Sequence, residues 1–325
     1  MNTSECPNPP GDVPVLRSAD YGFFGPDSVT WRVWTHPTAL LGFQRSVVLE
    51  QFDPYLAAAV ADQAGMYTDP RGRLDRTLGY FLTVAVGDSR TALAMSGALL
   101  GVHARATGIE PITGRRYRAD HPVSQLWIHV TGWHSVLKCY EMYGPGRLSP
   151  ADEARYWADC AVAAELQTCD AEDVPRSRAE LHAYYDTVRP QLCCSERAQR
   201  AMHYVLHTPL GAAGPVFWGA SHLAAPATIA TLPRWMRRLG GFDQPDVVSA
   251  AVRPATRAVI AGLTVPSLAD LLLPLLAPTT ATILQQHRMT GVPAAQEITT
   301  PAAARLHRAA TVAADTVGHA ARLVE

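Results

Sequence analysis

Apolar residues recur at helical spacing along most of the chain, and alternating runs of strand length are almost absent. Helix-start signals punctuate this pattern, because Asp or Ser caps a helix and Pro suits its first turn. Such signals stand at Asp53-Pro54 and Ser149-Pro150, and Ser177-Arg178-Ala179-Glu180 has the form of a capping box. The pattern predicts an all-α protein. Helices are expected from 37, over 55–64, 73–86, 90–106 and 121–142, from 150, from 177, and over 196–207, 222–239, 246–263, 267–287 and 301–323.

The same pattern predicts a single helical domain. We find no internal repeat and no low-complexity linker that would divide the 325 residues. Residues 1–25 are rich in Pro and are expected to form an extended arm, and residues 26–325 the domain. Residues 28–34 fit either a short strand or a first helical turn, and residues 108–119 a basic, turn-rich loop.

Charge and cysteine content narrow the function classes. With 28 basic and 29 acidic residues, the chain gives no electrostatic reason to expect nucleic acid as a partner. Six cysteines without CxxC spacing are typical of reduced thiols and indicate neither a disulfide framework nor a zinc site. The N-terminal residues lack a secretory-signal pattern, and the longest apolar run, 268–276, is too short for a transmembrane segment. We therefore expect a cytoplasmic protein.

Two arginines and a threonine form the first candidate site. Arg73, Arg76 and Thr77 are spaced i, i+3, i+4 and share a helix face that continues through Tyr80 and Phe81. Guanidinium groups on a buried face are costly unless something anionic or polar meets them. They could pair with acids at the helix start, such as Asp69 and Asp75, or they could serve a functional site. The spacing leaves both interpretations open.

Two histidines in apolar helices form the second candidate site. A lone His in such a helix is more often a hydrogen-bonded core residue than a ligand. His103, however, follows Leu99 and Leu100, and the nearby Gly97 and Gly101 each cost about 1 kcal/mol of helix stability unless another surface approaches the backbone. A flat apolar cofactor such as haem could pack there, because haem iron accepts a single proximal histidine.

The second histidine, His129, lies four residues before Trp133 and on the same helix face. It is the rival ligand to His103, or else a residue that supports the site by hydrogen bonding. Common nucleotide, hydrolase and metalloprotease motifs are absent from the sequence, so no other chemistry competes with these two candidate sites.

Several short motifs, in order and at the right spacing, resemble the latex-clearing-protein and MpaB oxygenase superfamily. The resemblance is strongest over residues 26–240. Its motifs are Asp53-Pro54-Tyr55-Leu56, Asp69-Pro70-Arg71-Gly72-Arg73-Leu74-Asp75-Arg76-Thr77, Val102-His103, Tyr117-Arg118-Ala119-Asp120, Trp127-Ile128-His129-Val130-Thr131 and Leu148-Ser149-Pro150-Ala151-Asp152.

The resemblance implies an all-helical fold with a globin-like core around one b-type haem. It implies His103 as the axial iron ligand, Arg73, Arg76 and Thr77 as distal or propionate-binding residues, and His129 and Trp133 as further residues around the cofactor. Two departures set this chain apart from the rubber-cleaving members. Arg76 stands where those members carry a lysine that can ligate iron, and arginine is a poor iron ligand. The helix before the motif offers only Asp62 as an acid, which counts against base-assisted polyisoprene cleavage.

Residues and resemblance together predict a haem b-dependent oxygenase. It would use dioxygen on a small apolar metabolite, by oxidative cleavage or oxygenation at an alkene. Two other hypotheses remain at this point. One is another haem enzyme of secondary metabolism, such as a peroxygenase or a redox-neutral haem catalyst. The other is a non-catalytic helical protein that binds haem or lipid.

Overall fold

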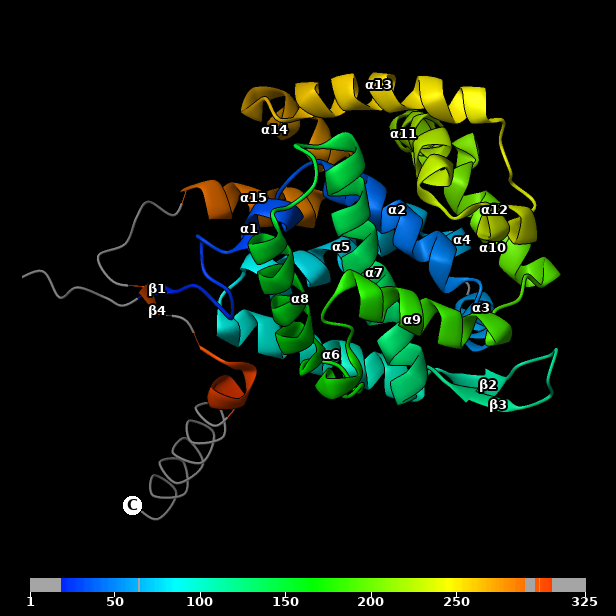
Figure 1. The fold of residues 1–325 in the computed structure, drawn as a ribbon, viewed down its shortest axis with the longest axis horizontal. Coiled ribbons are helices and arrows are strands. Elements are labelled where there is room, and N and C mark those ends of the chain that lie inside the picture. Colours follow the sequence, from blue (N-terminus) through cyan, green and yellow to red (C-terminus); the bar gives the residue numbers. More distant parts are fainter. Residues whose placement is uncertain (1–18, 64, 290–295, 298, 306–325) are drawn as a thin grey trace, which may run out of the picture.

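Helix α7, Pro122–Tyr143, is the buried axis of the fold (Figure 1). Of its 22 residues, 14 are buried, so the helix is enclosed on nearly all sides. Helix α2, Thr38–Glu50, packs along it. The two backbones meet at Gly42, where a Cβ atom would lie 2.6 Å from the Cα of Val136. Only glycine allows this approach.

The computed structural model describes residues 19–63, 65–289, 296–297 and 299–305, and it confirms the predicted all-α fold. Two-residue and three-residue strands make two small pairs, β1 with β4 in parallel and β2 with β3 antiparallel. The elements besides α2 and α7 are β1 Ala19–Asp20, α1 Val29–Trp34, α3 Pro54–Gln63, α4 Gly65–Thr68, α5 Pro70–Val86, α6 Ser89–Arg105, β2 Thr107–Ile109, β3 Arg116–Arg118, α8 Pro150–Ala164, the 3-10 turns Ala171–Asp173 and Arg189–Gln191, α9 Arg178–Val188, α10 Glu196–Leu206, α11 Leu210–Thr231, α12 Arg234–Gly240, α13 Asp246–Leu263, α14 Pro266–Leu276, α15 Pro278–Met289 and β4 Gln296–Glu297.

The helix starts that the sequence signals are confirmed by their capping hydrogen bonds. The Asp53 carboxylate accepts from the Leu56 backbone N–H at 2.8 Å, and the Ser149 hydroxyl accepts from that of Asp152 at 3.1 Å. Ser177 accepts from the N–H of Glu180 in the predicted capping box. Each bond satisfies a backbone donor that the first helical turn leaves open.

Residues 29–34 form helix α1, which is one of the two alternatives that the sequence left open for this segment. The structure differs from the expectation in two other places. The expected loop at 108–119 contains the hairpin β2–β3, whose strands are too short to show an alternating pattern. Helix α11 starts at Leu210, before the expected 222, and continues through a kink at Gly214, which has a φ of 79°. Most of the predicted arm and of the last expected helix lie outside the described residues, although 301–305 are helical.

Aromatic side chains hold α1, α5, α7 and α8 together in the core. The Trp34 ring stacks on Phe81 with centroids 5.4 Å apart and meets Trp133 edge-on at 5.3 Å. The Tyr156 hydroxyl donates to the backbone carbonyl of Trp133 at 2.8 Å. Rings of this size contribute large apolar areas, and the hydroxyl satisfies its own polar atom, so this cluster fixes the relative positions of the four helices.

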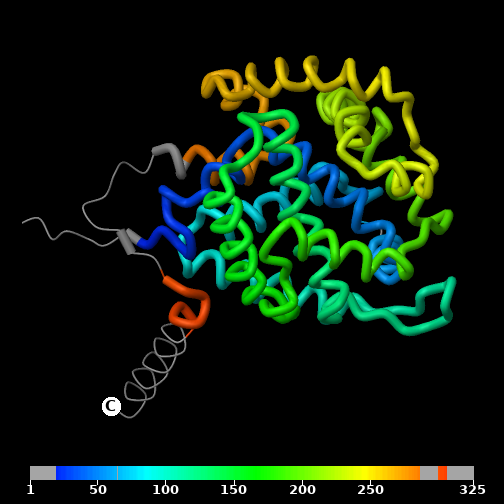
Figure 2. Tube along the Cα trace, viewed as in Figure 1, coloured from blue at the N-terminus to red at the C-terminus, as the bar shows by residue number. Residues whose placement is uncertain are grey.

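Helices α13 and α14 form a layer along one side of the molecule, in yellow to orange in Figure 2. Several of their apolar side chains face solvent, among them Val247, Val259, Val265 and Leu271. Among the described residues, no single helix is long and apolar enough to cross a membrane. Only α13 and α14 taken together, with a bend of 101° between them, meet the criteria of length and composition.

Asp75 gives the first testable prediction. This buried carboxylate on α5 accepts the Thr279 and Thr280 backbone N–H groups, each at 3.0 Å, and so caps α15. Asp75→Ala leaves both donors without a partner and should cost about 1–3 kcal/mol of unfolding free energy. Urea unfolding measures this loss, with the exposed Asp27→Ala as control. Equal effects of the two substitutions would contradict the capping role.

Candidate active site

A large apolar cavity lies between α2, α5, α11, α13, α14 and α15. Its volume is about 1000 Å³, and aliphatic side chains make most of its wall. This size and lining are typical of pockets that enclose a small apolar molecule. The apolar wall includes Leu40 and Val47 of α2, Leu74, Leu78 and Leu82 of α5, Ile260 of α13, Leu272, Leu273 and Leu276 of α14, and Leu284 of α15.

Glu50 of α2 and Arg73 of α5 place opposite charges on this apolar wall. The Ser46 hydroxyl donates to Glu50 Oε1 at 2.8 Å. Burial raises the pKa of the Glu50 carboxyl to about 7, and the Ser46 hydrogen bond and the Arg73 charge oppose this rise. Burial likewise lowers the pKa of Arg73, and the negative charge of Glu50 opposes that shift. Near neutral pH Glu50 can therefore hold or release a proton.

Thr77 lines the same cavity one helical turn after Arg73. Its hydroxyl donates to the backbone carbonyl of Arg73 at 2.9 Å, so its lone pairs remain available to accept a hydrogen bond. Arg76 behaves differently. Its side chain is 68% exposed and forms an ion pair with Asp69 at 3.0 Å. Of the three residues predicted on one face, Arg73 and Thr77 line the cavity, whereas Arg76 shows the helix-start pairing that was the alternative.

His103 of α6 lies close enough to Arg73 for the two groups to interact electrostatically. Burial lowers the pKa of the imidazole, the nearby Arg73 charge lowers it further, and a hydrogen bond with Gln125 opposes the shift. The ring is therefore neutral at physiological pH, which is the form that binds metals. His103 is not among the residues that line the cavity.

Gln125 of α7 determines which nitrogen of His103 is exposed to a ligand. The Gln125 Nε2 donates to the Ala119 carbonyl at 2.6 Å and lies 3.1 Å from His103 Nδ1. Because the Ala119 bond fixes the amide nitrogen as a donor, Nδ1 accepts and the ring proton lies on Nε2. A metal ion held at Nε2 would need the ring proton on Nδ1 instead.

His129 and Trp133 lie in the aromatic core, away from the cavity wall. His129 is buried, its ring centroid is 5.8 Å from that of Trp133, and its Nε2 donates to the Cys160 carbonyl at 2.7 Å. Burial lowers the pKa of His129 to about 4, and the Cys160 hydrogen bond opposes the shift. Its Nδ1 is buried and has no hydrogen-bond partner among the described residues.

The two glycines of α6 lie on a different helix face from His103. Gly101 is two residues before His103, so the two positions lie about 200° apart around the helix. Within the described part of the chain, a Cβ at Gly97 would meet nothing within 4 Å, and one at Gly101 only Arg105. No close approach of another element explains either glycine there. The described residues also contain no cluster of three or more His, Cys, Asp or Glu side chains that could hold a metal ion.

The cavity wall therefore carries one carboxylate, that of Glu50, the guanidinium groups of Arg32 and Arg73 and the imidazole of His36, and the neutral His103 lies near Arg73. A family model described as "ER-bound oxygenase mpaB/B'/Rubber oxygenase, catalytic domain" matches residues 31–264. The chain belongs to this oxygenase family. The match includes Glu50, Arg73, Thr77 and His103. No curated protein and no solved structure gives a match.

Membership in the mpaB/rubber oxygenase family confirms the resemblance that the sequence motifs indicate. The matched segment runs from within α1 to just past the end of α13, and so it contains most of the cavity wall. The remaining wall, from α14 and α15, comes from residues after the matched segment. In this chain, therefore, the cavity is closed by helices outside the family's catalytic domain.

Sequence reasoning missed Glu50. Asp62, the acid that it weighed, lies elsewhere: its carboxylate accepts from the Tyr117 hydroxyl at 2.7 Å and pairs with Arg197 at 3.3 Å. Glu50 follows the apolar run 47–49 on the cavity face of α2. The sequence signal for Glu50 was a single carboxylate at the end of an apolar helix. This signal does not indicate Arg73 as its partner, because the pairing depends on how α2 and α5 pack.

Glu50 gives the second prediction. The folded protein keeps the Glu50 proton between the unfolded pKa of about 4.5 and the folded value of about 7, so the contribution of this group to stability falls as pH rises through that window. Glu50→Gln removes the titration. At pH 4.5 the variant and the parent should have the same unfolding free energy. At pH 8 the unfolding free energy of the variant should be higher by about 2 kcal/mol, which is less than the full pKa shift would give because the Glu50 side chain is only partly buried.

Urea unfolding at the two pH values measures the difference. The matched control is Glu172→Gln, because the Glu172 side chain is 88% exposed. A Glu50→Gln difference that is the same at both pH values would show that the Glu50 pKa is not raised.

Proposed function

We propose that this member of the family is a haem b-dependent oxygenase that oxidises a small apolar substrate with dioxygen, at an alkene. The observation that carries the proposal is the apolar cavity with Glu50, Arg73 and Thr77 on its wall and the neutral His103 near Arg73. An apolar substrate would be held by burial of its surface, and the three polar groups would act on one part of it.

The choice of haem rests on the ligand set. Haem iron takes four ligands from its macrocycle and needs only one from the protein, which a single histidine can supply. His103 is neutral and partly buried, and its Nδ1 has a neighbouring amide that could orient the ring. Arg73 would offset the negative charge of the haem propionates. When bound, haem would supply the activation of dioxygen.

His129 and Trp133 would act on this site indirectly. They fix the packing of α7, and Gln125 reaches His103 from the first turn of that helix. The position of His103 Nε2 therefore depends on the packing of α7, although His129 itself is already hydrogen-bonded to Cys160.

Glu50 would accept a proton from the substrate during turnover. Its raised pKa, about 7, makes it a base that is half ionised at neutral pH. Arg73 would stabilise negative charge that develops nearby, in a site where apolar walls strengthen such interactions. Turnover should therefore rise with pH through about 7, because only the ionised carboxylate accepts the proton.

The route into the cavity would run between α13 and α14. Val259 lines the cavity and is also 63% exposed, so the wall is thin at this point. Leu271 of α14 is 66% exposed. An apolar substrate could pass over these side chains without crossing a polar barrier.

The third prediction concerns the cofactor. Protein produced in cells supplied with a haem precursor should show a Soret band and about one haem per chain. His103→Ala should lose haem or change the spectrum, whereas His129→Ala should retain the parent spectrum in whatever fraction folds. The absorption spectrum and the haem content measure both. If His129→Ala abolishes the Soret band and His103→Ala keeps it, the axial ligand is His129. A colourless protein that does not bind added hemin would end the haem proposal.

The fourth prediction uses the two arginines as a matched pair. Arg73→Gln should reduce turnover by about two orders of magnitude or more, because it removes the charge from the cavity wall. Arg76→Gln should leave turnover near that of the parent, because Arg76 is exposed and paired with Asp69. Oxygen consumption with an alkene substrate measures both variants. If both substitutions reduced turnover equally, Arg76 would act in the site, which would contradict its exposed position.

A further inference from the structure

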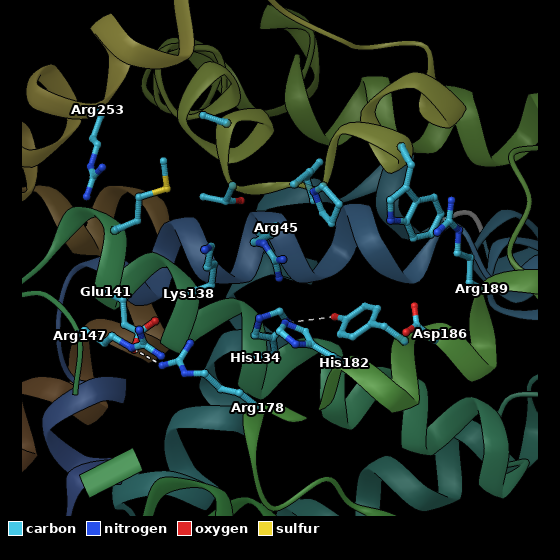
Figure 3. A pocket seen from close by; sticks show the side chains of 17 residues that line it. Arg45, His134, Lys138, Glu141, Arg147, Arg178, His182, Asp186, Arg189 and Arg253 are labelled. Atoms are coloured by element: carbon cyan, nitrogen blue, oxygen red, sulfur yellow. Dashed lines mark hydrogen bonds and ion pairs between the residues drawn. The ribbon is translucent and has the colours of Figure 1, made fainter. Parts of the chain in front are cut away.

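A second pocket, of about 1050 Å³, lies on the other side of α2 from the apolar cavity. The neighbouring residues Gln44 and Arg45 line the two cavities separately, Gln44 the apolar one and Arg45 the second. Figure 3 shows Arg45, Lys138, His134 and His182 in the middle of the second pocket. Nothing in the proposed oxygenase function uses it.

Positive charge dominates this pocket. Six Arg and Lys side chains line it against two carboxylates. One of those carboxylates, Glu141, is already bound by Arg178, which also pairs with Glu153. The six cations are Arg45, Lys138, Arg147, Arg178, Arg189 and Arg253, and the carboxylates are Glu141 and Asp186.

Arg45 is the residue that calls for an explanation. Its side chain is 2% exposed, its Nη1 donates to the Ser135 hydroxyl at 2.7 Å, and its Nε has no partner among the described residues. No described carboxylate forms an ion pair with it. A buried guanidinium without a counter-charge is strongly unfavourable, so such a group is typical of a site that receives an anion.

The groups around Arg45 add further positive charge, and the carboxylate that acts on Lys138, Glu141, is bound by Arg178. Lys138 lines the same pocket. Burial lowers the pKa of His134 well below its usual value, and the charged groups that lower it further are Arg45, Lys138, Arg178 and His182. His134 Nδ1 lies 3.1 Å from the Tyr185 hydroxyl.

Part of the pocket wall is apolar and aromatic. Leu232, Pro233 and Trp235 line it, and the Arg189 guanidinium stacks over the Trp235 ring at 4.6 Å. The pocket therefore offers cations together with a surface for an organic group. Its volume leaves room for both parts of a small molecule.

We propose that this pocket binds a small organic phosphate, with the phosphate on Arg45 and Lys138 and the organic part against Leu232, Pro233 and Trp235. Two cations without carboxylate partners match the charge of a phosphate group, which is close to −2 at neutral pH. The Arg45 guanidinium and the Lys138 ammonium, which both line the pocket, supply donors for tetrahedral phosphate oxygens. The site is separate from the oxygenase cavity, and it does not depend on the haem proposal.

The fifth prediction tests this site with inorganic pyrophosphate as the probe, titrated calorimetrically into the purified full-length protein. Pyrophosphate should bind saturably, and Lys138→Met should weaken the dissociation constant by roughly tenfold or more. The matched control is Arg155→Met on α8, whose side chain is 75% exposed and does not line the pocket. This control should bind as the parent does. Arg45→Met should also lose binding, and Lys138→Met keeps the test valid if the buried Arg45 substitution does not fold.

Three results would overturn the proposal. Absence of saturable binding, or equal weakening in Lys138→Met and Arg155→Met, would show that the cations act only as general surface charge. Loss of pyrophosphate binding after saturation with hemin would assign the cations to the haem carboxylates instead. An unchanged dissociation constant in the hemin-saturated protein would support a separate phosphate site.

Discussion

The close packing of α2 on α7 is the constraint on which both cavities depend. At Gly42 the two backbones approach so closely that even a methyl group would overlap Val136. This contact fixes the rotation of α2 about its own axis. Glu50 then faces the apolar cavity, and Arg45 faces the cationic pocket. A larger residue at position 42 would push α2 away from α7 and change the shape of both cavities at once.

The residues from Arg73 to Thr77 have three different roles, in the cavity wall, in a helix cap and in a surface ion pair. Helix geometry explains the difference. Arg73 and Thr77, four residues apart, are nearly in line and both line the cavity. Asp75 lies on another side and caps α15 with its carboxylate. Arg76 is turned toward solvent, where it pairs with Asp69. Because α15 also contributes to the cavity wall, the Asp75 cap helps to enclose the space that Arg73 faces.

The sequence predicts the helices well because their signals are local. Capping at Asp53, Ser149 and Ser177 depends on residues three positions away, and the structure shows each bond. The site is less predictable because its contacts are long-range. Nothing near Glu50 in the sequence indicates Arg73, and nothing near His103 indicates Gln125. The family resemblance supplied the motif that includes Arg73 and Thr77, but spacing alone could not separate Arg73 from Arg76.

The buried charges of this fold differ in what offsets their cost. Glu50 has a hydroxyl donor and the nearby positive charge of Arg73, and its raised pKa lets it lose its charge near neutral pH. Arg45 has no such option, because a guanidinium keeps its proton at all physiological pH values. Burial of the charged Arg45 beside Ser135 therefore destabilises the folded protein at every physiological pH, and a bound anion would reduce this destabilisation. A ligand on Arg45 would consequently stabilise α2 against α7, and through α2 it would steady the helix that carries Glu50 into the oxygenase cavity.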